Sequence, residues 1–306
     1  MNETAEQGAP AGPPWIQPAI QEQIEWRDGD VVVSVPFKSG TTWTMNIVHQ
    51  LMTGGTKNFR DIYEEVPWIE FLGSPETTQQ SVVDRVAAMP TDARRAFKTH
   101  SPAPVVPFQA AGSGKDVKYV VILRNPEEAV VSFKTFLEKH ADEWFALWGM
   151  PREALCRPDF ATFYHDIIDG YGMQGGLFGF LAAWWPLRNE PNVLLMHFAD
   201  MKKDHEGSLR KIADFIGEAP SDAQWANILE YTSFPWMKQN QSKFEAITAG
   251  KVPILKSGAM IRKGAVGEAK ADGMTDEIAQ HLREVGGQMC ADAAAVNWLY
   301  EGGMLP

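Results

Sequence analysis

The chain has 306 residues, 44% of them hydrophobic, so it can bury the core of one large domain or two small ones. It contains 28 Lys+Arg and 39 Asp+Glu, a formal net charge of -11, which argues against a nucleic-acid partner or binding to an anionic membrane. Cys156 and Cys290 are too few for a disulfide framework and lack metal-ligand spacing. We therefore expect a cytoplasmic protein without a metal site.

Residues 1–14 are rich in Ala, Gly, Pro and Glu and lack the basic and apolar regions of a signal peptide, so they are predicted to be a disordered tail. Residues 15–306 then form the domain. No run approaches the ~18 apolar residues of a transmembrane helix, so we expect no membrane insertion.

Short apolar strands alternate with helices along most of the chain. Strands are predicted at 31–35, 96–99, 117–123 and 193–198, and helices at 41–52, 127–139, 176–188 and 202–216, the last capped by Gly217. Further helices are predicted at 221–231 and at 275–285, where Gly286-Gly287 should end the helix, with loops between them. This alternation predicts a single α/β domain with a central, mostly parallel sheet flanked by helices.

The first strand runs into Lys38-Ser39-Gly40-Thr41-Thr42-Trp43. Free amides at a helix start, a glycine and a nearby ammonium suit a phosphate or sulfate. In the P-loop of ATPases the lysine follows the second glycine, whereas here Lys38 precedes Gly40. We therefore predict an anion site that is P-loop-like but not that of an ordinary ATPase.

Two more strands end in basic residues at the same edge of the predicted sheet. After the second strand, His100 is a candidate base and Lys98 a candidate stabiliser of negative charge; a structural role for the histidine is the alternative. After the third strand, the Arg124 guanidinium can bind a phosphate through two hydrogen bonds, with Ser132 in the following helix. Alternatively, Arg124 pairs with Asp116 or Glu128, and Ser132 bonds the carbonyl one turn back.

A fourth basic segment, Arg262-Lys263-Gly264, lies far downstream, where the glycine frees the backbone to wrap an anion. An ordinary basic surface loop is the alternative.

In this order, KSGTTW, KTH, RNP-x5-S and RKG-x2-G resemble the motifs of cytosolic sulfotransferases, which use 3′-phosphoadenylyl sulfate (PAPS). Tyr231-Thr232-Ser233-Phe234, Trp184-Trp185 and Asp200-Met201-Lys202 support the resemblance, and the chain is identified as a member of that family. The resemblance implies a P-loop-like sulfotransferase architecture. It also implies transfer of a sulfuryl group to a hydroxyl of a small or lipid-like acceptor, with adenosine 3′,5′-bisphosphate (PAP) as product and no metal.

The resemblance also implies a role for each matching residue. His100 is the implied base, Lys38 contacts the leaving phosphate oxygen, Lys98 stabilises the transferring group and Ser39 restrains Lys38. The implied nucleotide site comprises the Gly40 loop with Thr41 and Thr42 for the 5′-phosphate, Trp43, Thr232 and Phe234 for adenine, and Arg124, Ser132, Arg262, Lys263 and Gly264 for the 3′-phosphate.

Some features depart from the family pattern. Phe198, also placed at the nucleotide, stands where the family usually has tyrosine, and Gly267-Glu268-Ala269-Lys270 lacks the family's tryptophan. The family's dimerisation motif is not recognisable, so the oligomeric state stays open. Residues 144–176 match nothing in the family and are predicted to form a mobile cover over the acceptor, which the sequence does not identify.

Two other functions remain as alternatives. A nucleotide kinase would require metal-dependent ATP turnover, which the position of Lys38 and the lack of a clear acidic Mg²⁺ ligand disfavour. A module that binds the nucleotide without catalysis is disfavoured because Lys38 and His100 are both present.

Overall fold

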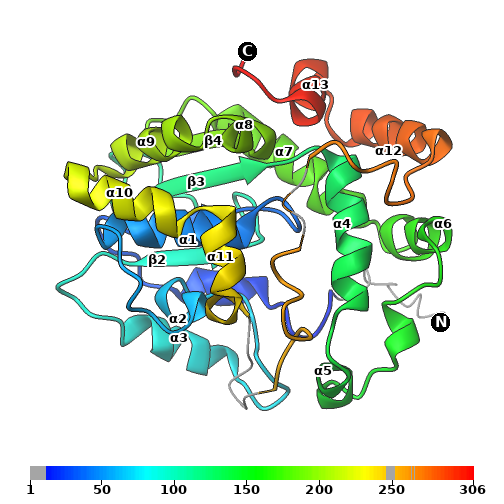
Figure 1. The fold of residues 1–306 in the computed structure, drawn as a ribbon, viewed down its shortest axis with the longest axis horizontal. Coiled ribbons are helices and arrows are strands. Elements are labelled where there is room, and N and C mark those ends of the chain that lie inside the picture. The colour runs from blue at the N-terminus through cyan, green and yellow to red at the C-terminus, as the bar shows by residue number, and fades with distance from the viewer. Residues whose placement is uncertain (1–11, 246–251, 263, 265) are drawn as a thin grey trace, which may run out of the picture.

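The computed structural model describes residues 12–245, 252–262, 264 and 266–306. Its central sheet has the order β2-β1-β3-β4, and every neighbouring pair is parallel (Figure 1). The strands are β1 (Val31–Ser34), β2 (Ala96–Thr99), β3 (Lys118–Leu123) and β4 (Val193–His197). In register, Val32 of β1 lies between Phe97 and Tyr119. The predicted α/β fold with a parallel sheet is thereby confirmed.

Helices and helical turns connect and cover the strands. The helices are α1 (Thr41–Met52), α2 (Ile62–Glu65), α3 (Gln79–Ala87), α4 (Pro126–Glu138), α5 (Asp142–Leu147), α6 (Phe160–Phe163), α7 (Phe178–Trp184), α8 (Phe198–Lys203), α9 (His205–Ile216), α10 (Asp222–Tyr231), α11 (Phe234–Gln239), α12 (Asp276–Met289) and α13 (Ala293–Glu301). Short 3-10 turns occupy Pro18–Gln23, Arg152–Ala154, Met173–Gly176, Trp185–Leu187 and Gln241–Phe244, and a π-helical turn occupies Tyr164–Asp169.

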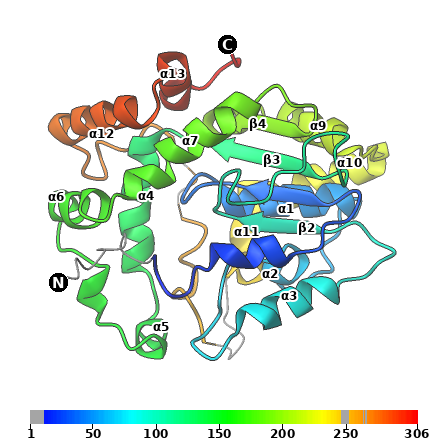
Figure 2. The same cartoon turned by 180° about the vertical axis from the view of Figure 1, so that it is seen from behind.

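The sheet separates two hydrophobic cores because successive strand residues point to opposite faces. Val31 and Val33 of β1 pack with α1, α9 and α10 on the face toward the viewer in Figure 1. Val32 of β1 packs with α4, α7, α12 and α13 on the other face, seen in Figure 2. Burial on both faces explains why the strands are almost entirely apolar.

Some predicted boundaries were wrong. The predicted helix 202–216 is two helices, since Asp204 accepts a hydrogen bond from the Gly207 amide and thereby caps the start of α9. The helix predicted to stop at Gly286-Gly287 continues to Met289. A Cβ on Gly286 would lie 2.4 Å from the Phe178 ring, so this glycine permits close packing of α12 against α7 and does not end the helix.

Other boundaries differ by a residue or a turn. Strand β4 ends at His197 because the His197 side chain caps α8, placing Phe198 in the first turn of that helix. The predicted helix 176–188 is α7 followed by a 3-10 turn at Trp185–Leu187. After Tyr231, where a loop was expected, α11 begins at Phe234 with Ser233 as its cap. The predicted Gly217 cap is confirmed, with φ 78°.

A buried ion pair joins the amino-terminal ends of two strands. The Arg95 guanidinium donates to both carboxylate oxygens of Asp30, at 2.9 and 2.6 Å, and both side chains are almost completely buried. Arg95 also donates to the carbonyls of Glu25 and Val86, so the pair connects four segments. Such a pair is costly to break because the remaining charge would stay buried.

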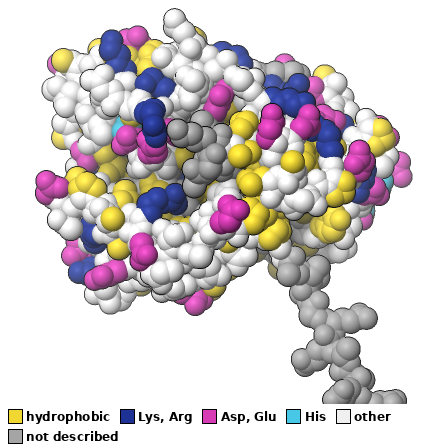
Figure 3. Space-filling model, turned by 90° about the horizontal axis from the view of Figure 1, so that it is seen from below, with side chains coloured by type: hydrophobic (Ala, Val, Ile, Leu, Met, Phe, Trp, Pro, Cys, Tyr) yellow, Lys and Arg dark blue, Asp and Glu magenta, His cyan; other side chains and the backbone are white. Residues whose placement is uncertain are grey.

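Charges of both signs are interspersed on the surface that Figure 3 shows, with hydrophobic side chains gathered between them. No helix within the described residues is long and apolar enough to cross a bilayer.

Candidate active site

A cavity of about 1080 Å³ includes residues from the carboxyl ends of β1, β2 and β3 among its lining. Nearly all the described residues predicted for the site line it: Lys38, Gly40, Thr41, Thr42, Trp43, Lys98, His100, Arg124, Ser132, Phe198, Thr232, Phe234, Arg262 and Gly264. Ser39 does not; its side chain is buried and its hydroxyl donates to the Phe37 carbonyl. Lys263 lies outside the described residues.

The loop after β1 is held in an unusual backbone conformation. Lys38 has φ 57°, and Gly40, the N-cap of α1, has φ 98°. A Cβ at Gly40 would lie 2.6 Å from the Phe198 ring, so only glycine fits there without displacement. Gly40 also offers no side chain to cap the first amides of α1, which leaves these donors available for an anion.

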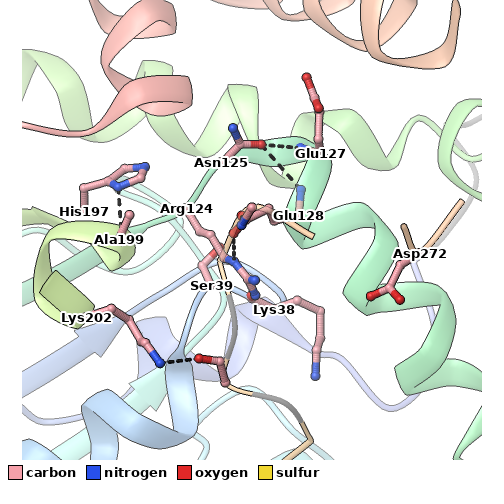
Figure 4. Close-up of polar contacts among 12 residues, drawn as sticks. Lys38, Ser39, Arg124, Asn125, Glu127, Glu128, His197, Ala199, Lys202 and Asp272 are labelled. Atoms are coloured by element: carbon pink, nitrogen blue, oxygen red, sulfur yellow. Dashed lines mark hydrogen bonds and ion pairs between the residues drawn. The ribbon is translucent and has the colours of Figure 1, made fainter. Parts of the chain in front are cut away.

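Lys38 connects this loop to the adjacent strand end. Its carbonyl accepts a hydrogen bond from Arg124 Nη1 at 3.0 Å (Figure 4). Its Nζ lies 4.3 Å from the centre of the Phe136 ring. Burial lowers the Lys38 pKa to about 7, and the positive charges of Arg124 and Arg262 add to the effect. A bound anion would raise the Lys38 pKa again and favour the ammonium form.

One hydrogen bond fixes which nitrogen of His100 is basic. His100 Nδ1 lies 2.6 Å from the Val35 carbonyl oxygen. Because a carbonyl only accepts, Nδ1 is assigned the proton and Nε2 has the free lone pair. Burial, followed by the charge of Lys98, holds the His100 pKa well below its usual range, so the imidazole is neutral and able to accept a proton at pH 7.

Lys98 lies beside this imidazole at the end of β2. Its Nζ is 3.2 Å from the centre of the Trp68 ring. Burial lowers the Lys98 pKa to about 7; the Glu70 carboxylate opposes that shift, and Lys38 reinforces it. The strand end thus provides a neutral base and a desolvated amine next to each other.

Two arginines from distant segments line another part of the cavity. Arg124 Nε lies 2.9 Å from the Glu128 carboxylate (Figure 4). The Arg124 guanidinium is 4.8 Å from the centre of the Phe198 ring. Arg262 donates to Thr135 Oγ1 at 3.2 Å and to Asp272 at 3.3 Å. Both therefore remain paired with carboxylates while lining the cavity.

Arg124 pairs with Glu128, and Ser132 lines the cavity. Of the two acids predicted as alternatives, Glu128 forms the ion pair with Arg124. Asp116 instead lies 3.2 Å from Lys118. No hydrogen bond from the Ser132 hydroxyl to the carbonyl one turn back occurs among the described residues, and Ser132 lines the cavity.

The predicted adenine residues form a partly open aromatic wall. Trp43 Nε1 donates to the Thr232 carbonyl at 2.8 Å, and Phe234 is 38% exposed, which leaves ring surface for stacking. A Cβ on Gly264 would lie 2.6 Å from Phe234, and Lys202 donates to the Gly264 carbonyl. The Thr232 hydroxyl donates to the Ile228 carbonyl one turn back and lies 3.0 Å from His205 Nε2, which also belongs to the cavity lining.

A further part of the cavity is aromatic. Trp15 packs edge-on against Trp144 with ring centres 4.7 Å apart and lies 5.4 Å from Trp148. Trp68 and Phe71 stack at 4.5 Å near His100. Residues 12–14, predicted as part of the tail, line the cavity, whereas 1–11 lie outside the described residues. Many residues of 144–176 also line it; the mobility of that cover remains a prediction.

The sequence analysis gave no site role to three polar residues that lie here. Lys202 and His205 line the cavity from α8 and α9, and buried Glu70 accepts hydrogen bonds from Thr99 and His100. An acid flanked by Ile69 and Phe71 was a usable signal for Glu70, because a carboxylate in an apolar run needs a partner.

Comparison with known proteins gives a consistent result. Residues 28–293 match the sulfotransferase domain family. Sulfotransferase 1A1 of Rattus norvegicus is 28% identical over 275 residues, covering 86% of this chain and 84% of that protein. Sulfotransferase 1E1 of Bos taurus is 30% identical over 254 residues, covering 81% and 79%.

Solved structures show the same fold. Mouse sulfotransferase SULT7A1 complexed with PAP superposes with a TM-score of 0.67 at 22% identity, covering 95% of this chain and 94% of that one. Retinol dehydratase in complex with retinol and PAP gives 0.67 at 21% identity, covering 92% and 84%. The extent of the domain match shows that this chain belongs to the sulfotransferase family.

Proposed function

We propose that this protein transfers the sulfuryl group of PAPS to a hydroxyl of a small-molecule acceptor. The main observation is that one cavity contains the neutral base His100, the lysines Lys38 and Lys98, and the guanidinium groups of Arg124 and Arg262. The PAP in the structures of two relatives supports this choice of donor.

The residues present fit a bisphosphorylated nucleotide. The uncapped amides after Gly40 would hold the 5′-phosphate. Arg124 and Arg262 would hold the 3′-phosphate, and the phosphate would replace part of their present pairing with Glu128 and Asp272. Trp43 and the exposed ring face of Phe234 would contact adenine. The lowered pKa of Lys38 adds to the fit, since an anion beside it would favour its charged form.

The chemistry assigned to these side chains is a single displacement. His100 Nε2 accepts the proton of the acceptor hydroxyl as that oxygen forms the new bond to sulfur. The bond from sulfur to the bridging oxygen breaks, and its electron pair stays on the phosphate. Lys38 stabilises that leaving oxygen, while Lys98 stabilises charge on the sulfuryl oxygens.

The acceptor that fits best is a neutral, lipophilic alcohol or phenol. The wall formed by Trp15, Trp68, Phe71, Trp144 and Trp148 offers apolar contacts. The acidic residues in the described lining lie elsewhere: Glu128 and Asp272 pair with the arginines, and Glu268 belongs to the segment that follows Arg262. Retinol and androsterone, bound in structures of retinol dehydratase, have this lipophilic character.

The test is to incubate the purified protein with PAPS, a chelator and a panel of phenols, aliphatic alcohols and glycolipids, and to measure PAP together with sulfated product. Equal amounts of both, without added metal, are expected for at least one neutral acceptor. PAP binding without product across the panel would favour a non-catalytic module. Metal-dependent turnover of ATP would favour a kinase.

A further inference from the structure

A fully buried carboxylate lies beneath the residues proposed for sulfuryl transfer. Glu70 Oε1 accepts hydrogen bonds from the His100 amide at 2.6 Å and from Thr99 Oγ1 at 2.9 Å. Oε2 is also buried and has no hydrogen-bond partner among the described residues. Leaving a carboxylate oxygen in this state is costly unless a nearby positive charge compensates it.

Lys98 supplies that charge. Its Nζ lies over the Trp68 ring at 3.2 Å and 5.3 Å from the centre of the Tyr63 ring, and its interaction with Glu70 opposes the effect of burial on its pKa. The other titratable groups that act on Lys98 and His100 are basic, since Lys38 lowers the pKa of both. Of the charged groups acting on this pair, Glu70 is thus the acidic one.

The same carboxylate also anchors His100. It anchors the His100 backbone through the amide, while the Val35 carbonyl orients the ring, so the two contacts together fix the position of Nε2.

We propose that Glu70 is a positioning residue for sulfuryl transfer, which anchors His100 and acts as the counter-charge that keeps Lys98 an ammonium ion. This inference rests on the proposed function. It assigns to Glu70 an effect on the pH range of activity that a purely structural residue would not have.

The direction of that effect follows from the charges. Lys98 acts in its protonated form, so activity falls as pH rises through the Lys98 pKa, which burial has already lowered to about 7. The Lys38 pKa is also lowered to about 7, but the phosphate of saturating PAPS beside Lys38 favours its ammonium form. Removing the carboxylate charge lowers this pKa further and moves the upper limb of the kcat profile to lower pH. The His100 pKa lies well below its usual range, whereas burial raises the pKa of Glu70, so protonation of the Glu70 carboxylate contributes to the lower limb of the profile.

Glu70→Gln is the decisive variant because it keeps an oxygen for the His100 amide and removes only the charge. With saturating PAPS and 2-naphthol, we expect the upper limb to move down by about one pH unit, with kcat about tenfold lower at pH 7.5 and recovering at lower pH. Glu70→Asp, which keeps the charge but shortens the side chain, should lower kcat without moving the limb. Exposed Glu76→Gln is the matched control and should match the wild type.

A second measurement does not require turnover. The Lys98 side-chain pKa can be measured by NMR with [ε-15N]lysine labelling, its signal assigned by its loss in Lys98→Met. A lower Lys98 pKa in Glu70→Gln is expected even if no acceptor is turned over. An unchanged pKa in folded Glu70→Gln, or a kcat loss equal at all pH values, would overturn the proposal.

Discussion

At the scale of single residues, His100 depends on one carbonyl for its chemistry. Val35 accepts from Nδ1, so Nε2 keeps its lone pair, and burial with neighbouring lysines keeps the ring neutral. The cost is a weakly basic nitrogen, which the proposed mechanism tolerates because the proton moves together with bond formation to sulfur.

His100→Ala should lower kcat by about 10²- to 10⁴-fold, the usual contribution of a general base, and leave PAP affinity within about twofold. Calorimetry with PAP and the acceptor assay measure the two effects separately. Exposed His165→Ala is the matched control and should change neither. A comparable loss of PAP affinity in His100→Ala would show that this residue belongs to the nucleotide site.

Arg124 is expected to distinguish PAP from nucleotides lacking the 3′-phosphate. Arg124→Ala should weaken PAP binding by about 10- to 100-fold, the value of a charged hydrogen bond, and leave 5′-AMP binding almost unchanged. Calorimetry with both ligands gives the ratio. Arg188 also packs on an aromatic ring, 4.6 Å from Trp185, but does not line the cavity, so Arg188→Ala is the control. An unchanged ratio in Arg124→Ala would place the 3′-phosphate elsewhere.

At the scale of elements, the turn from β1 to α1 brings together a strained backbone and an aromatic ring from α8. Gly40 combines φ 98° with a Cβ position only 2.6 Å from Phe198. The anion site thus depends on contact between two helices as well as on the local sequence.

Gly40→Ala should destabilise the protein by about 1–3 kcal/mol through backbone strain, and the loss of stability is larger if the Phe198 ring does not move away. The substitution should also weaken PAP binding. Gly217→Ala is the control, because Gly217 has φ 78° but no atom within 4 Å of the added Cβ. It should cost roughly 1 kcal/mol and leave PAP affinity unchanged. Urea unfolding and calorimetry provide the comparison, and equal PAP affinity in Gly40→Ala and the wild type would contradict the role of this turn.

At the scale of the whole molecule, the active-site cavity and the buried pair of Arg95 with Asp30 lie at opposite ends of the strands. Stability and ligand binding should therefore respond separately to changes at the two ends.

Arg95→Ala should lower the free energy of unfolding by about 3–5 kcal/mol because Asp30 would remain buried without its partner. Arg94→Ala is the neighbouring control, since Arg94 pairs with Glu218 at the surface, and it should cost less than about 1 kcal/mol. Chemical denaturation measures both. The Arg95→Ala protein that remains folded should bind PAP normally, and a large loss of affinity would show that the two ends are coupled.

The parallel α/β fold and the order of the anion-binding segments could be predicted from the sequence alone. Strand runs, the Lys38–Trp43 turn and the Arg124-Asn125-Pro126 junction are local patterns whose chemistry can be inferred from neighbouring residues. Because parallel strands end at one edge, their basic residues could also be predicted to converge.

The way in which the remaining residues join the site depends on contacts that form only in the folded chain. Trp15 meets Trp144, and Glu70 reaches His100, across separations in sequence that no local pattern encodes. The basic nitrogen of His100 depends on the carbonyl of Val35, from a neighbouring strand segment. Helix α12 continues past Gly286, where the Phe178 ring packs against the glycine. In each case the deciding interaction is a contact between distant segments, which exists only once the chain has folded.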